Sequence, residues 1–181
     1  MRSPSFLTFL SLAVGSLLCQ VQANEVIYAD GSLKANWSTR GLGTTIDLST
    51  SDAVANTVSV AVNSTQNGFI SFFTPKPFGK TAKGLQFDIS GNQPNLMVEA
   101  LSDIDWAVSK RIPLSELVPV SSITSDKFST VFLDFNKIYI PYQPTYPTAP
   151  DNWDTITFYA PGSEGAVYRL NNLQLVEGTC P

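Results

Sequence analysis

Two pairs of carboxylates have a spacing that sugar-cleaving chemistry could use. Asp103 and Asp105 stand in "SDIDW", and Asp151 and Asp154 stand in "DNWD". A glycosidase needs two carboxyl groups about 5–10 Å apart on either side of the scissile bond. Closely spaced aspartates are also ordinary turn residues, because their side chains bond the local backbone. We favour the turn interpretation for both pairs.

Aromatic side chains are the chain's main asset for binding a ligand. Five of them lie near the ends of predicted strands or in a proline-rich stretch, and we take them as candidate ligand-binding residues: Trp37, Trp106, Tyr142, Tyr146 and Trp153. Aromatic faces stack on sugars and on flat apolar ligands alike. The alternative is that Trp106 and Trp153 fill the ends of the core.

Three cations complete the candidate site. Arg40 is a candidate ligand-binding residue, and Lys110 and Arg169 are candidate hydrogen-bond donors for catalysis. Arg169 alternates with Tyr168 and Leu170, so its side chain should face away from the core. On an outer sheet face it could donate to a carbonyl or hydroxyl oxygen, and plain solvation is the alternative.

The absence of histidine excludes several kinds of site. It removes serine and cysteine triads that use an imidazole base, and zinc or copper sites with histidine ligands. "RGLGTT" at Arg40 lacks the third glycine and the following helix of a phosphate-binding loop. We therefore expect no cofactor and no metal.

The segment "PYQPTYPTAPDNW", Pro141–Trp153, has proline at every third position up to Pro150. That period is the period of polyproline II, and proline fixes φ and donates no backbone hydrogen bond. One hypothesis is a stiff lid over one end of the fold, with Tyr142, Tyr146 and Trp153 facing a ligand. The alternative is a cover for a sheet edge, because proline discourages edge pairing.

The elements that must position these residues are strands. Short runs alternate apolar and polar residues, are rich in β-branched and aromatic side chains, and are separated by turn residues. The runs are Glu25–Ala29, Thr44–Leu48, Thr57–Val62, Gly68–Phe73, Gly84–Ile89, Leu96–Leu101, Ser129–Phe135, Asp154–Ala160 and Ala166–Val176. Asn67–Gly68 predicts a tight hairpin turn, and Pro113–Val118 allows one helical turn at most.

Many short strands with turns between them predict an all-β fold, an antiparallel two-sheet jelly-roll β-sandwich. No internal repeat and no linker divides the sequence, so we expect one domain. The alternating apolar runs predict these core residues: Phe87, Val98, Phe132, Ile156, Leu170 and Leu173.

The first residues predict a secretory signal. A basic start, the apolar run Phe6–Leu18 and small residues at Val21 and Ala23 favour residues 1–23 as a cleaved leader and residues 24–181 as the single β-sandwich domain. A lipoprotein signal on Cys19 is the alternative, and Leu18 before it argues against that. No other apolar run is long enough to cross a bilayer.

Charge and the remaining cysteine limit the partners. Without the leader, ten basic residues face 15 acidic ones, a net charge of −5, and no basic patch suits nucleic acid. Cys180 then stands alone beside the C-terminus. It could form a dimer by pairing with another chain, but a free thiol on the tail is favoured.

Two sequons, "NWS" at Asn36 and "NST" at Asn63, predict N-glycosylation. Behind a leader they indicate a eukaryotic secretory protein with surface positions at both sites.

Three segments follow one another in a familiar order: "VIYADGSLKANWS", "KGLQFDISG" and "WDTITFYAPGSEGAVYRLNNLQLV". Their order resembles the galactose-binding-like jelly roll shared by many carbohydrate-binding modules. It implies a ligand face for a glycan. The family's frequent calcium site usually has an acid on the last strand, where this chain has Asn171, so the resemblance puts that metal in doubt.

A secreted, glycosylated sandwich of this size also looks like the small fungal hetero-Diels–Alderases of tropolone sesquiterpenoid pathways. That resemblance implies a cofactor-free pericyclase of secondary-metabolite biosynthesis, acting on a hydrophobic small molecule by orienting and polarising its reactants. We place this interpretation slightly ahead. The alternative is a carbohydrate-binding module or lectin-like protein without catalysis.

Overall fold

The computed structural model describes residues 22–52, 57–91, 93, 95–102, 109–139, 152–162 and 166–177. All nine predicted strand segments overlap strands of this part of the chain. Its helical elements are short: the 3-10 turns Leu114–Glu116 and Val120–Ser122, and the single-turn helix α1 (Phe135–Ile138). No described helix has the length and apolar character needed to span a membrane.

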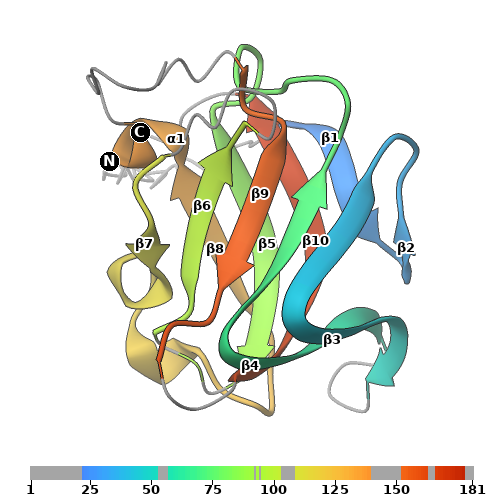
Figure 1. Cartoon of the computed structure of the whole chain (residues 1–181), viewed down its shortest axis with the longest axis vertical. Helices are drawn as coiled ribbons and strands as arrows, with labels where there is room; N and C mark the ends of the chain where they lie inside the picture. Colours follow the sequence, from blue (N-terminus) through green and yellow to red (C-terminus); the bar gives the residue numbers. More distant parts are fainter. Residues whose placement is uncertain are drawn as a thin grey trace, which may run out of the picture.

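The strands form two antiparallel layers that pack face to face (Figure 1). The first layer contains β2 (Ser32–Leu33), β1 (Gln22–Ala29), β10 (Ala166–Glu177), β5 (Gly84–Gly91) and β8 (Ser129–Asp134). The second contains β3 (Ser38–Asp52), β4 (Thr57–Phe73), β9 (Thr155–Tyr159), β6 (Met97–Leu101) and β7 (Ile112–Pro113). The expected antiparallel jelly-roll sandwich is confirmed. As drawn, β1 begins at Gln22, two residues before the domain start predicted from the leader.

Strand β4 belongs to both layers. Its first half pairs with β10 between Val60 and Ser64, and its second half pairs with β9 between Phe69 and Phe73. Because the same strand continues from one layer into the other, the two sheets are joined by hydrogen bonds as well as by side-chain packing.

The hairpin predicted at Asn67–Gly68 is wrong, because β4 runs through this pair without reversing. Asn67 has φ 56° and Gly43 on the neighbouring β3 has φ 59°. A Cβ on Gly68 would lie 2.5 Å from the Gly43 carbonyl oxygen. The register shifts here, with more residues on β4 than on β3, as in a β-bulge. The left-handed residues therefore bend the strand instead of closing a turn.

Five of the six predicted core residues are confirmed as fully buried: Phe87, Val98, Ile156, Leu170 and Leu173. The prediction that Phe132 belongs to the core is wrong, since this residue is only half-buried. In β8 the inward positions are taken by Val131 and Leu133. The Phe132 ring packs on the opposite face, against Gly84 of β5, where a Cβ would lie 2.6 Å from it.

Phe158 is the central aromatic contact between the layers. It lies on β9, and its ring meets Phe87 of β5 edge-on at a centroid distance of 5.0 Å and Phe72 of β4 at 6.2 Å. Edge-to-face pairs at these distances contribute beyond their buried area.

A second set of rings forms what we call the aromatic cluster: Trp37, Phe78, Phe135 and Trp153. Successive ring centroids lie 5.9, 5.9 and 5.5 Å apart. The Trp37 Nε1 donates a 2.7 Å hydrogen bond to Glu25 Oε1. The cluster joins four segments that are distant in the sequence.

Truncating Phe158 to alanine should lower the free energy of unfolding by about 3–5 kcal/mol, because it leaves a cavity where three rings meet. The measurement is urea denaturation of the purified protein. Phe132→Ala is the control, and it should cost clearly less because that ring is half-buried. Equal losses in the two variants would contradict the assignment of Phe158 to the centre of the core.

The protein should lose stability at alkaline pH. Burial, with a contribution from the charge of Asp47, raises the pKa of Tyr28 to about 12, and burial also raises the pKa of Tyr168. The unfolded tyrosine has a pKa of 10, so above that pH the unfolded chain releases protons that the folded chain retains.

The stabilising contribution of Tyr28 is therefore complete below pH 10 and is lost as the pH rises to about 12. Urea denaturation across this range should show a falling free energy of unfolding. Tyr28→Phe, which removes the phenol that bonds the Leu48 carbonyl at 2.7 Å, should make the fall shallower. A variant with an unchanged slope would show that Tyr28 does not carry the effect.

Candidate functional site

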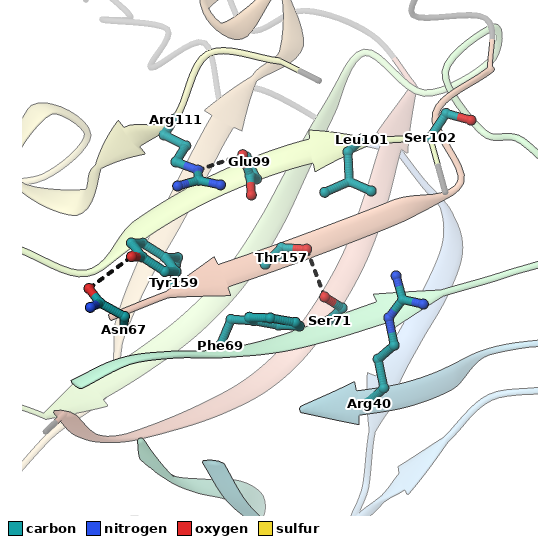
Figure 2. A pocket seen from close by; sticks show the side chains of 10 residues that line it. All are labelled: Arg40, Asn67, Phe69, Ser71, Glu99, Leu101, Ser102, Arg111, Thr157 and Tyr159. Atoms are coloured by element: carbon teal, nitrogen blue, oxygen red, sulfur yellow. Dashed lines mark hydrogen bonds and ion pairs between the residues drawn. The ribbon is translucent and has the colours of Figure 1, made fainter. Parts of the chain in front are cut away.

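A cavity of about 510 Å³ lies on the outer face of the second layer (Figure 2). We call it the groove, and its lining residues are Arg40, Asn67, Phe69, Ser71, Glu99, Leu101, Ser102, Arg111, Thr157 and Tyr159. Its volume falls in the usual range for small-molecule sites, about 300–1,000 Å³.

Strand alternation explains why these residues face the groove. In β4, Ile70 and Phe72 are fully buried in the core, and Phe69 and Ser71 line the groove from the other face. The same two-residue period applies to β9 and β6, because successive side chains of a strand point to opposite faces. The core and the groove are therefore the two faces of the same strands.

Strand register places the lining residues in rows across the sheet. One row is aromatic, since Phe69 of β4 stands directly opposite Tyr159 of β9, with the exposed Leu42 of β3 beside Phe69. The next row, which we call the polar row, contains Arg40, Ser71, Thr157 and Glu99 on four neighbouring strands.

The two hydroxyl groups in the middle of the polar row are hydrogen-bonded to each other. Ser71 Oγ and Thr157 Oγ1 share a buried hydrogen bond of 2.8 Å. At one end of the row, the Arg40 guanidinium lies 5.3 Å from the centroid of the Phe73 ring, a cation–π contact. These interactions hold the hydroxyls and the guanidinium in place without a ligand.

The other end of the groove contains an ion pair. Arg111 Nε donates a 2.8 Å hydrogen bond to Glu99 Oε2, and this bond holds the pKa of the guanidinium above its ordinary value. The Glu99 side chain is 5% exposed, whereas that of Arg111 is 50% exposed. Arg111 also lies over the Tyr159 ring, 4.7 Å from its centroid, and Tyr159 donates to Asn67 Oδ1 at 2.9 Å.

This arrangement offers ring surfaces beside fixed hydrogen-bond donors and acceptors. Such a groove suits a ligand that has both an apolar face and many hydroxyl or carbonyl groups. Among the described residues, no three acidic or cysteine side chains gather as the ligands of a metal ion would.

Of the predicted ligand-binding and catalytic residues that the structure describes, Arg40 alone lines the groove. Trp37 and Trp153 are 5% and 1% exposed and belong to the aromatic cluster. Lys110 is exposed and its ammonium lies 4.0 Å from Glu116. Arg169 is half-buried beside a separate cavity of about 260 Å³ that Ser90, Gly91 and Ser125 also line. The structure does not bring Lys110 and Arg169 together.

Other predicted residues lie outside the described part of the chain. They are Trp106, Tyr142, Tyr146, Cys180, Asp103, Asp105 and Asp151. Most of the segment Pro141–Trp153, for which we predicted a lid, lies outside the residues that the structure describes. Trp153, at the end of the segment, is described and is buried in the core. Asp154 is buried and accepts a 2.7 Å hydrogen bond from the Thr155 hydroxyl.

Sequence reasoning missed Phe69, Tyr159 and Glu99 as site residues. The available signal was a strand with apolar residues at both alternating positions. "GFISFF" fills its inward positions with Ile70 and Phe72 and still carries Phe69 on the outer face. An aromatic residue at such an outer position is a candidate for binding.

No protein-family model and no curated protein matches the chain. Solved structures similar to this chain include carbohydrate-binding modules. A family 29 module is 17% identical with a TM-score of 0.57, over 87% of this chain and 91% of that chain. A variant of a family 29 module complexed with mannohexaose is 16% identical with a TM-score of 0.57, over 89% of this chain and 100% of that chain.

A family 11 module from a cellulosomal cellulase of Clostridium thermocellum is 16% identical with a TM-score of 0.55, over 87% of this chain and 97% of that chain. At these identities the likeness concerns the fold alone. The resemblance to carbohydrate-binding jelly rolls is confirmed at that level. None of these three structures is a pericyclase, and the resemblance to the hetero-Diels–Alderases stays a prediction.

Proposed function

We propose that this chain is a glycan-binding protein and that its groove holds an oligosaccharide. The observation that carries the proposal is the aromatic row of Phe69 and Tyr159 beside the polar row on one hollowed sheet face. A pyranose ring presents an apolar face of C–H groups and an edge of hydroxyls. The two rows match those two surfaces.

The groove is built before the ligand arrives. Ser71 bonds Thr157, Tyr159 bonds Asn67, and Arg111 bonds Glu99. Because these side chains are already fixed, little conformational entropy is lost on binding, and this preorganisation raises affinity.

The structural likeness supports the same ligand class. The similar structures include variants of a family 29 module complexed with mannohexaose and with cellohexaose. A shared fold does not fix a function, so the groove residues of this chain carry the argument and the likeness adds to it.

The pericyclase interpretation has less support. Its two candidate donors, Lys110 and Arg169, are absent from the groove lining. The groove's own cations are Arg40 and Arg111, and each lies against an aromatic ring. Glycan binding without catalysis, which was our alternative interpretation, therefore becomes the leading one.

We also propose that the protein is secreted after cleavage behind Ala23 and carries N-glycans. Asn36 and Asn63 are both exposed, so both sequons present their amide to solvent. Endoglycosidase treatment of protein made in a eukaryotic host should increase its electrophoretic mobility. Asn36→Gln and Asn63→Gln should each remove part of that change. If treatment does not shift the mobility of the parent protein, the sequons are empty.

The binding proposal predicts that Phe69→Ala and Tyr159→Ala each weaken affinity for a neutral hexasaccharide about tenfold. A tenfold loss corresponds to about 1.4 kcal/mol, the upper part of the range for an aromatic contact. Titration calorimetry with mannohexaose and cellohexaose measures it.

The matched control is Tyr139→Ala, which removes an aromatic side chain that is 40% exposed and does not line the groove. Affinity should be unchanged in this variant, and the thermal midpoints of all three variants should stay close to that of the parent. If Phe69→Ala and Tyr159→Ala bind both oligosaccharides as the parent does, the groove is not the glycan site.

A further inference from the structure

The sequon asparagine Asn63 stands between two close neighbours on the outer face of the first layer. It lies on the half of β4 that pairs with β10. Strand register places Val167 of β10 directly opposite it on one side and Thr45 of β3 directly opposite it on the other. All three residues are exposed, so their side chains share one face of the sheet.

Val167 leaves apolar surface in solvent. The residue is 63% exposed, and the other exposed large apolar residues of the described chain are Leu42 and Tyr139. Leu42 has a place beside the aromatic row of the groove, whereas Val167 lies on the other layer. Removing apolar surface from water is favourable in proportion to its area. A partner that covered the Val167 methyl groups would therefore stabilise the fold.

The surface beside Val167 is hollowed. Val167 lines the separate cavity of about 260 Å³, to which Ser90, Ser125 and Arg169 contribute hydroxyl and guanidinium groups. Because β10 lies between β4 and β5, this cavity is on the far side of Val167 from Asn63. A chain of sugars that starts at Asn63 and crosses β10 would meet an apolar surface first and polar groups next.

We propose that Val167 and this cavity form a docking surface for the N-glycan of Asn63, with the first N-acetylglucosamine packed against the Val167 methyl groups. The inference rests on the proposed occupancy of this sequon. Directly opposite residues of antiparallel strands have Cβ atoms about 4.5–5.5 Å apart, so a sugar linked to the Asn63 amide lies within contact distance of Val167. The C–H groups of that sugar cover the methyl groups, and the sugars that follow lie over the cavity.

The two flanks of Asn63 differ, and the difference sets the direction of the glycan. Thr45 offers a hydroxyl group, whose removal from water costs free energy unless a new hydrogen bond replaces the lost ones. Val167 offers methyl groups, whose removal from water is favourable. The glycan therefore crosses β10 and not β3. The groove stays open, since none of these three residues lines it.

The experiment is a double-mutant cycle on protein made in a eukaryotic host that adds high-mannose glycans. Thermal midpoints are compared for the parent, Asn63→Gln, Val167→Thr and the double variant, and mass spectrometry determines the occupancy of Asn63. Val167→Thr keeps the β-branched shape and replaces one methyl group. Asn63→Gln should lower the midpoint of the parent by about 2–4 °C, the shift that a small loss of stability produces in a chain of this size. It should lower the midpoint of Val167→Thr by less than half as much.

Enzymatic trimming separates the first sugar from the rest. An endoglycosidase that leaves one N-acetylglucosamine on Asn63 should preserve most of the difference in midpoint between the parent and Asn63→Gln, because the sugar that covers Val167 remains. Nuclear Overhauser cross-peaks should connect protons of this sugar with the Val167 methyl protons. That measurement needs no substitution, so it stays decisive if a variant fails to fold.

Two controls have matched substitutions. Thr45→Ala removes the side chain on the opposite flank, and Asn63→Gln should lower its midpoint as much as that of the parent. Ser38→Ala removes the sequon of Asn36 without replacing the residue at φ 72°, and Asn63→Gln should again have its full effect there.

The outcomes separate the proposals from one another. If Asn63 is occupied and Asn63→Gln has the same effect in the parent and in Val167→Thr, the docking surface is wrong and N-glycosylation stands. Absence of the cross-peaks, or a trimmed parent with the midpoint of Asn63→Gln, likewise overturns the contact of the first sugar with Val167. An unoccupied Asn63 overturns both glycosylation of this site and its docking surface. None of these results bears on glycan binding in the groove, which calorimetry measures.

Discussion

The whole architecture depends on strand β4 passing from one layer to the other. The passage requires Gly68 and Gly43 to approach so closely that a single added carbon would lie 2.5 Å from a carbonyl oxygen. Once β4 has bent there, its first half pairs with β10 and its second half with β9. The position of β9 then sets Phe158 against Phe87 inside the sandwich and Tyr159 beside Phe69 outside it.

The strands and most of the core could be predicted because each follows from local alternation. Ile156 and Leu170 sit at apolar positions of period-two runs, and both are buried. Phe132 could not be placed this way. All three residues from Val131 to Leu133 are apolar, so alternation does not tell which of them face the core. The hairpin prediction at Asn67–Gly68 failed for a related reason. A residue with positive φ suits a tight turn and a β-bulge equally well, and the strands that pair around it decide between the two.

The groove itself was beyond sequence reasoning, and Trp37 shows why. A tryptophan near a strand end suggests a binding site, but Trp37 contacts Phe78 and bonds Glu25, contacts made by residues distant in the sequence. Glu99 lies on β6 and Arg111 lies twelve residues later, directly before β7, and the two meet because β6 and β7 pair. Register, which single-sequence patterns do not give, assembles the site.

The division of each strand into an inward and an outward face has a consequence for how such a protein can change over time. Replacing Ser71 or Thr157 changes the surface of the groove, whereas the neighbouring Phe72 and Ile156 lie on the opposite face, in the core. The groove surface can therefore diverge while the core is kept. Solved carbohydrate-binding modules have the same kind of sandwich at only 16–17% identity to this chain, so the fold tolerates replacement of most of its side chains.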